Sequence, residues 1–282
     1  MSAGDSVHAA LAEATSLLAG TSPTARLDAE TLLAHASAMN RNDLVVRAQR
    51  RLDTAVLARF RDLVERRVRG EPVAYLTGRR EFWSLDLEVT PATLIPRPET
   101  ELLVERALQR LDPEREALMA DLGTGSGAIA LAVAHERPRV RVVATDRSAS
   151  ALAVARRNAA RLGIVNVEFR EGGWLAPLDE LRVDLIVSNP PYVALGDPHL
   201  GEGDLRFEPV DALVAGPGGL EAIRHIARNA RHHLLPGGRL ILEHGYDQAD
   251  AVRALLRESG YRGVTSHRDL AGVERVTEGD AD

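Results

Sequence analysis

Up to about residue 78, hydrophobic positions recur among polar ones with the period of a helix. Behind an expected N-cap at Ser6, the first apolar stripe consists of Val7, Ala10, Leu11, Ala14, Leu17 and Leu18. Further helical segments begin at Pro23 and Asp53, with stripes at Leu27, Leu32 and Leu33 and at Val56, Leu57, Phe60, Leu63 and Val64. Such stripes are typical of core packing, so we expect a helical bundle that carries no catalytic group.

The period changes after Arg79. From Glu81 to Val89 apolar and polar residues alternate, which predicts a strand or a hairpin. Pro98 can then begin a helix, because proline suits the first helical position. We therefore expect a helical domain at 1–78, a β-hairpin linker at 79–97 and a second domain at 98–282.

Short apolar runs alternate with helical segments from about residue 115. Strands are predicted at 118–122, 140–144, 165–169, 184–188 and 240–243, the last after a turn at 236–238, and helices at 128–134 and 148–161. Two more strands are expected between Gly263 and Thr277. This alternation predicts an α/β fold with a parallel sheet covered on both faces.

Composition excludes several kinds of chemistry. The 282 residues include no cysteine, which rules out a thiol nucleophile, a disulfide and a cysteine zinc site. All 35 positive charges are arginine, so there is no P-loop lysine and no Schiff-base lysine. The histidines are not spaced as a ligand set, and no metal site is expected.

Charge and hydropathy narrow the class of partner. The net charge of −6 argues against a general nucleic-acid binder, since those usually carry a basic stripe. No apolar run reaches the roughly 18 residues of a membrane span, and the N-terminus has no signal-peptide core. We expect a cytoplasmic protein that forms no stable complex with nucleic acid and does not associate with membranes.

A glycine-rich loop follows the first predicted strand. Its residues are Asp121, Leu122, Gly123, Thr124, Gly125, Ser126 and Gly127. Glycines allow a tight turn and a close approach of ligand, and the helix that follows favours polar groups at its N-terminus. Asp146, at the end of the second strand, can accept both hydroxyls of a ribose.

The loop alone leaves two cofactor classes open. With Ala128 it also fits the G-x-G-x-x-A fingerprint of dinucleotide binding, so an NAD-linked dehydrogenase remains possible. An acid just before the glycines, here Asp121, resembles the S-adenosylmethionine (SAM) methyltransferases, in which it faces the methionine end of the cofactor. That resemblance favours SAM.

The fourth strand runs into Asn189, Pro190, Pro191 and Tyr192. Ligands of open α/β sheets bind at the carboxyl ends of strands, so this tetrapeptide is expected in the same crevice as the glycine loop. Prolines fix the backbone, so the Asn189 side-chain oxygen and the Pro190 carbonyl become rigid acceptors, and Tyr192 supplies a flat wall. Two converging acceptors suit a planar NH₂ group, whose remaining lone pair they direct toward an electrophile.

Almost the whole chain resembles the bacterial protein-(glutamine-N5) methyltransferases that modify class I peptide chain release factors. The resemblance rests on the glycine loop, Asp146, Trp174, Asn189–Tyr192 and the segments 95–101, 197–200, 206–209, 243–245 and 268–269. It implies a class I SAM-dependent, Rossmann-like methyltransferase sheet, whose last strand inserts antiparallel, behind an N-terminal helical domain that recognises substrate.

The resemblance also assigns roles to residues. SAM would be held by Asp121, the backbone of Gly123, Thr124, Gly125, Ser126 and Gly127, and by Asp146, Trp174 and Asn189. Asn189, Pro190, Pro191 and Tyr192 would hold the glutamine of the Gly-Gly-Gln loop, with Asn189, Pro190 and Tyr192 catalytic. The chain departs from the family at Gly172-Gly173, where a small polar or acidic residue often precedes the tryptophan, so a side-chain contact to adenine would be missing.

Two other functions stay open. A nucleic-acid methyltransferase acting on adenine N6 or guanine N2 could use the same pair of acceptors on a flipped base. A non-catalytic SAM-binding module is the second, although cofactor binding alone has no use for an amide clamp. We expect a monomer.

Overall fold

The computed structural model describes residues 5–282, which form two compact units. One unit contains the described residues up to Arg79 together with Gly201–Phe207. The other contains Arg80–Leu200 and Glu208–Asp282.

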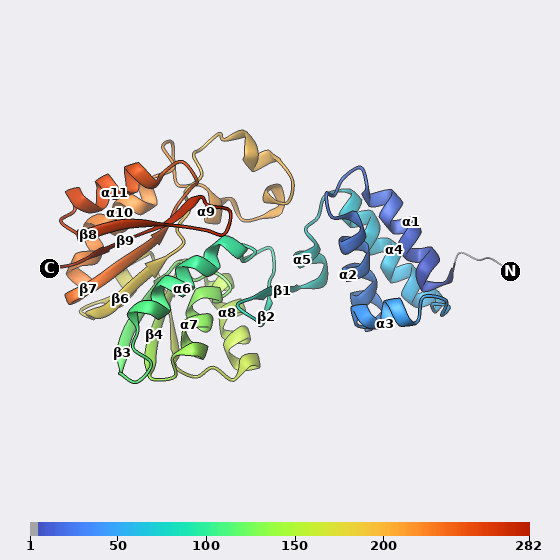
Figure 1. Ribbon diagram of the computed structural model, residues 1–282, viewed down its shortest axis with the longest axis horizontal. Coiled ribbons are helices and arrows are strands. Elements are labelled where there is room, and N and C mark those ends of the chain that lie inside the picture. Colours follow the sequence, from blue (N-terminus) through green and yellow to red (C-terminus); the bar gives the residue numbers. More distant parts are fainter. Residues whose placement is uncertain (1–4) are drawn as a thin grey trace. The chain divides into compact units, whose positions relative to one another are not determined.

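The first unit is built from helices. They are α1 (Val7–Leu18), α2 (Ala25–Ser37), α3 (Arg41–Val46), α4 (Thr54–Val68) and α5 (Val73–Thr77). Helices α1, α2 and α4 pack against one another (Figure 1), and their apolar stripes fill a single core. The Ser6 hydroxyl accepts the Ala9 N–H at 3.2 Å, which confirms the predicted N-cap.

Several sequence predictions for this unit need correction. Leu17 and Leu27 lie outside the core, 55% and 44% exposed, because the neighbouring positions already fill the face that each helix buries. The second helix begins at Ala25 and not at Pro23. Helices α3 and α5 were not expected, since 6 and 5 residues are too short to display a period.

A segment from far along the chain completes the helical unit. Arg67, which is buried, pairs with Asp28 and with Asp204 of that segment, each at 2.8 Å. Arg206, two residues further, donates to the backbone carbonyl of Arg69. Removing the charge of Arg67 would leave Asp28 buried without its cation.

A hairpin of β1 (Arg79–Phe82) and β2 (Leu85–Glu88) follows, and all of it except Arg79 belongs to the second unit. Its two turn residues, Trp83 and Ser84, have φ of 51° and 59°, as a type I′ turn requires. Neither is glycine, and carboxylates hold both: Glu101 accepts the Trp83 N–H at 3.0 Å and Glu81 the Ser84 N–H at 2.6 Å.

A seven-stranded sheet forms the centre of the second unit, in the order β5-β4-β3-β6-β7-β9-β8. The strands are β3 (Ala117–Leu122), β4 (Val140–Asp146), β5 (Val167–Glu171), β6 (Val183–Ser188), β7 (Leu234–Glu243), β8 (Arg262–Arg268) and β9 (Glu274–Asp280). The first five are mutually parallel, and β9 is inserted antiparallel between β7 and β8. The α/β fold and the antiparallel last strand are thereby confirmed.

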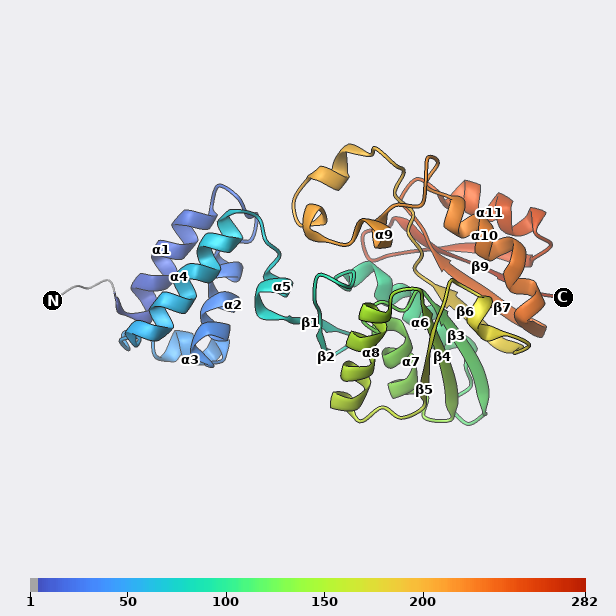
Figure 2. The ribbon, with the colours of Figure 1, turned by 180° about the vertical axis from the view of Figure 1, so that it is seen from behind.

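Helices cover both faces of this sheet. The helices of this unit are α6 (Glu101–Arg110, after a 3₁₀ turn at Pro98–Thr100), α7 (Ala128–Glu136), α8 (Ala149–Leu162), α9 (Val210–Leu213), α10 (Glu221–Ala230) and α11 (Ala249–Glu258). Figure 2 shows α7 and α8 beside β4 and β5. Helix α6 packs against β6, β7 and β9, α10 packs against β7, and α11 packs against β8 and β9.

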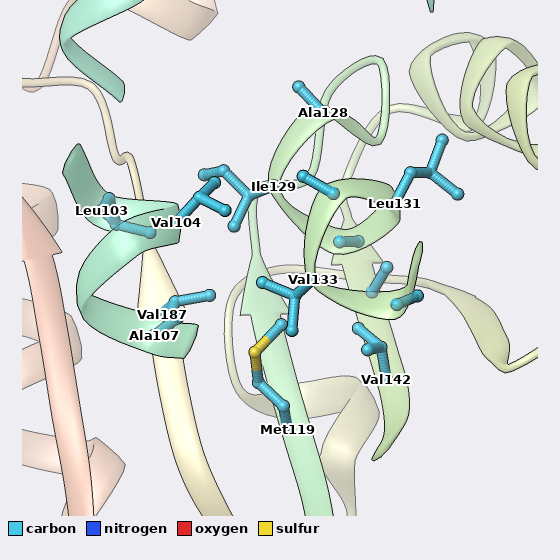
Figure 3. Close-up of a cluster of buried hydrophobic side chains, with 14 of the residues drawn as sticks. Leu103, Val104, Ala107, Met119, Ala128, Ile129, Leu131, Val133, Val142 and Val187 are labelled. Carbon is cyan, nitrogen blue, oxygen red and sulfur yellow. The ribbon is translucent and has the colours of Figure 1, made fainter. Parts of the chain in front are cut away.

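The period of two along each strand divides the apolar residues between two cores. Met119, Val142 and Val187 pack with α6 and α7 (Figure 3). Their neighbours Ala120 and Val143 join the core formed by α10 and α11 on the other face. Alternate side chains of a strand point to opposite faces, so the central strands β3, β4 and β6 are buried on both faces, whereas the edge strand β5 has no fully buried residue.

The prediction that a strand begins at residue 240, after a turn at 236–238, is wrong. These residues lie inside β7, where the pairing with β6 shifts register between Val183 and Leu185. A Cβ on Gly238 would approach the Leu235 carbonyl oxygen to 2.8 Å, so glycine is needed at this irregularity.

Across residues 5–282, each helix is too short or too polar to cross a membrane.

Candidate functional site

The glycine loop leaves β3 at Leu122 and enters α7 at Ala128. Gly123, Gly125 and Gly127 have φ of 74°, 57° and 85°, a region that side chains disfavour. The carbonyl of Thr145 on β4 accepts the N–H groups of Gly123 and Thr124 at 2.8 and 2.9 Å. The loop is thus anchored to the neighbouring strand.

Two of these glycines serve different needs. A Cβ on Gly127 would lie 3.0 Å from Leu131 Cδ1 and 3.2 Å from Ala155 Cβ, so this glycine permits close helix packing. A Cβ on Gly125 would meet no described atom within 4 Å, and Gly125 lines a cavity. Glycine at 125 therefore keeps that cavity open.

Asp121 lies behind the loop, fully buried, and does not line the cavity. Its Oδ2 accepts the Thr124 hydroxyl at 2.6 Å and the Ala130 N–H at 3.2 Å. Its Oδ1 has no hydrogen-bond partner among the described residues. Burial raises the pKa of Asp121 to about 7, and the negative charge of Asp146 adds to the rise.

Asp146, the last residue of β4, does line the cavity. Its Oδ2 accepts the Gly125 N–H and its Oδ1 accepts the Ser148 N–H, both at 2.9 Å. A carboxylate oxygen can accept more than one hydrogen bond. Each oxygen of Asp146 can therefore also accept one hydroxyl group from a ligand.

The cavity has a volume of about 530 Å³, within the usual range for cofactor sites. Gly173 and Trp174 line it, and the backbone of Trp174 has a φ of 48°. The Thr145 hydroxyl donates to the Trp174 carbonyl at 2.9 Å. A Cβ on Gly123 would come within 3.3 Å of the Trp174 ring, so the ring packs directly on the glycine loop.

The tetrapeptide after β6 reaches the same cavity through Asn189 and Pro191. Asn189 is half-buried and its Nδ2 donates to the Thr100 hydroxyl at 3.1 Å. Pro190 is buried and does not line the cavity. The Tyr192 hydroxyl donates to Glu243 Oε1 at 3.4 Å, and burial, followed by the charge of Glu243, raises its pKa.

Glu208 fixes the segment that leads to Thr100. Its carboxylate is 4% exposed, accepts the Ile95 N–H at 3.0 Å and pairs with Arg97. Glu208 thus ties two segments together that are distant in sequence.

The structure brings half of the predicted site residues into the lining of one cavity. Gly123, Gly125, Asp146, Trp174, Asn189 and Pro191 line one cavity, whereas Asp121, Thr124, Ser126, Gly127, Pro190 and Tyr192 support it from outside its lining. Sequence reasoning assigned no role to several lining residues from other segments: Ala92, Thr93, Leu94, Pro209, Asp211, Glu221 and His225. The available signals were the position of Pro209 in the resembling segment 206–209 and the proximity of Thr93 and Leu94 to the segment 95–101.

His244 is a structural histidine. It is fully buried, with Nδ1 2.9 Å from the Gly245 carbonyl oxygen and Nε2 2.8 Å from the Thr277 hydroxyl. Burial lowers the pKa of His244, so the neutral ring is favoured. Within residues 5–282, no three histidine or acidic side chains are grouped as a metal site would require.

Comparisons with known proteins match both units. Residues 9–78 match the family model described as the PrmC N-terminal domain, and residues 98–200 match the methyltransferase small domain. The chain is 56% identical to the release factor glutamine methyltransferase of Xylella fastidiosa strain Temecula1, over 93% of this chain and 96% of that protein. It is 55% identical to the release factor glutamine methyltransferase of Pseudomonas aeruginosa, over 92% and 93%.

A solved structure agrees at the level of fold. A methyltransferase from Pyrococcus furiosus superimposes with a TM-score of 0.53 at 21% identity, covering 70% of this chain and 89% of that one. At this identity the likeness concerns the methyltransferase fold alone.

Proposed function

The chain belongs to the release factor glutamine methyltransferase family, and from that membership we propose that it uses SAM to methylate the side-chain nitrogen (N5) of the glutamine in the Gly-Gly-Gln loop of class I peptide chain release factors. The single observation that carries the proposal is the cavity shared by Asp146 and Asn189. One residue suits a ribose and the other an amide. Release factors act in translation termination, so the proposed place of action is the cytoplasm.

The residues of the cavity fit SAM. Gly125 leaves space where any side chain would intrude, and Asp146 keeps one acceptor site on each oxygen for the two ribose hydroxyls. Trp174 offers a flat surface for the adenine, and Gly173 carries no side chain to read its amino group. SAM, when bound, would supply an electrophilic methyl group at its positively charged sulfur.

Asn189 and Pro190 would act on the glutamine amide. An amide nitrogen is a poor nucleophile because its lone pair is delocalised into the carbonyl group. Acceptors on both N–H bonds stabilise the positive charge that develops on nitrogen and fix the direction of attack. Prolines at 190 and 191 keep these acceptors preorganised, because both backbone φ angles are restricted.

The direct test is methyl transfer from radiolabelled SAM to a purified class I release factor. The labelled product should vanish when the loop glutamine is replaced by alanine, because the accepting nitrogen is then absent. Label that persists in the substituted factor would place the methyl group elsewhere. Label found only in DNA or RNA would favour the nucleic-acid methyltransferase.

We also propose that the helical unit docks the release factor. It carries no motif for chemistry, and its family model is defined as a domain of its own. A chain beginning at Arg79 should still bind SAM and methylate a short peptide that carries the Gly-Gly-Gln loop. Its activity on the intact factor should fall sharply, and equal activity of the two chains on the intact factor would exclude docking by the helical unit.

A further inference from the structure

A segment between β6 and α10 forms one side of the cavity. We call residues 209–215 the wall segment, and its lining residues are Pro209, Asp211, Ala212, Val214 and Ala215. Near its far end, the Val193 N–H donates to the Leu213 carbonyl and the Val193 carbonyl accepts the Ala215 N–H, both at 3.0 Å. Backbone pairing therefore holds the far end of the wall segment.

The near end of the wall segment begins at Glu208. This residue is the first of the second unit after Gly201–Phe207, which belongs to the helical unit. The Glu208 side chain is fully buried, and its Oε2 accepts the Ile95 N–H at 3.0 Å while its Oε1 pairs with Arg97. Residues 92–94, directly before Ile95, line the same cavity. One buried carboxylate thus joins two parts of the lining that are more than 100 positions apart.

A second contact of the wall segment is exposed to solvent. Arg147, which follows Asp146, pairs with Asp211 at 2.7 Å, and the two side chains are 61% and 83% exposed. Water and salt screen such a pair, so it contributes little. Removing one partner of a buried pair is costly, because the other partner loses its compensation. The position of the wall segment should therefore depend on Glu208 far more than on Asp211.

We propose that Glu208 is a positioning residue that clamps the wall segment to residues 92–97 and so keeps the cavity in the shape that binds SAM. The proposal rests on the proposed function, in which SAM occupies this cavity. Without the clamp, the two parts of the lining separate in most molecules. The apparent affinity then falls in proportion to the fraction of molecules that keep the binding shape.

The first test uses a nearly isosteric change. Glu208→Gln leaves one accepting oxygen, which can serve the Ile95 N–H or Arg97 but not both. The Kd for SAM, measured by calorimetry, should rise about 10- to 100-fold, as for an enzyme that keeps the binding shape in about 1–10% of molecules. With SAM saturating, kcat on a release factor should stay within about threefold, because Asn189 is untouched. Glu180→Gln removes an exposed carboxylate and controls for net charge.

A double-mutant cycle asks whether Glu208 acts through Arg97. Arg97→Gln alone should also raise the Kd for SAM, because the buried Glu208 loses its cation. Combined with Glu208→Gln, it should cost much less than the sum of the two single changes, because both disrupt the same clamp. Fully additive costs would overturn the proposal, as would a folded Glu208→Gln enzyme with the SAM affinity of the wild type.

Hydrogen exchange of the unliganded enzyme separates a local clamp from general stability. In Glu208→Gln, peptides that cover residues 92–97 and 209–215 should exchange about 10- to 100-fold faster, whereas peptides of β3 and β4 should keep the wild-type rates. Asp211→Asn should leave residues 92–97 as protected as in the wild type. Unchanged exchange of both segments in Glu208→Gln would overturn the proposal, and so would equal acceleration throughout the sheet.

Two further outcomes remain decisive. If Glu208→Gln does not fold, Arg97→Gln takes its place, because the Arg97 side chain is 29% exposed and can be replaced with less disturbance. A folded Arg97→Gln enzyme with wild-type SAM affinity and wild-type exchange would overturn the clamp. A wild type that does not bind SAM would refute the proposed function, while the exchange of the two segments still decides whether Glu208 holds them together.

Discussion

Asp146 offers the sharpest test of how the cofactor is held. Asp146→Ala removes a carboxylate whose two oxygens each have an acceptor site left for a ribose hydroxyl. Hydrogen bonds to a charged group contribute about 1.5–3 kcal/mol, so the Kd for SAM should rise by about 10- to 150-fold. Calorimetric titration of the purified enzyme with SAM measures this directly.

The substitution has a second effect that needs a control. It also frees the N–H groups of Gly125 and Ser148, so part of the loss could come from a looser glycine loop. A SAM analogue without the ribose hydroxyls separates the two, because it should bind wild type and variant with similar affinity if only the hydroxyl contacts matter. Asp250→Ala, which removes a carboxylate that is 98% exposed, controls for the change of net charge.

Two results would refute this reasoning. A SAM affinity within twofold of the wild type, in a folded Asp146→Ala enzyme, would exclude the ribose contact and reopen the dinucleotide alternative. The second result would be that Asp146→Ala weakens binding of the hydroxyl-free analogue as much as binding of SAM. The lost affinity would then come from a perturbed glycine loop and not from the ribose contact.

The remaining predictions concern turnover, pH and stability. Asn189→Ala should lower kcat by about 10²–10³-fold, with a much smaller effect on the Kd for SAM, because the lost hydrogen bond strengthens in the transition state; near-normal turnover would exclude the amide clamp. Wild-type kcat should fall as the pH drops through about 7, because Glu243, whose pKa burial raises to about 7, loses the charge that accepts the Tyr192 hydroxyl. Glu243→Gln should lack this inflection, and an inflection that persists there would point to another group such as Asp121. Arg67→Ala should lower the free energy of unfolding by about 3–5 kcal/mol in urea titrations, because Asp28 stays buried without its cation. Arg66→Ala, which removes an arginine that is 37% exposed, should cost less than about 1 kcal/mol.

The sequence by itself determined the order and kind of the long elements. Periods of 3.6 and 2 are local properties, so they predicted α1, α4 and most strands to within a few residues, together with the parallel sheet. The sequence also predicted that the glycine loop, Asp146 and Asn189 lie at one site, because the carboxyl ends of parallel strands meet at one edge of the sheet.

Tertiary structure decided what depends on segments distant in sequence. No local pattern indicates that Gly201–Phe207 belongs with the helical unit, because that follows from the pairing of Asp204 with Arg67 across 137 positions. The hydrogen bond from Asn189 to Thr100, 89 positions away, is hidden for the same reason. A residue type predicts which bonds a side chain can form, but only the packed fold decides which partner is within reach and sheltered from water.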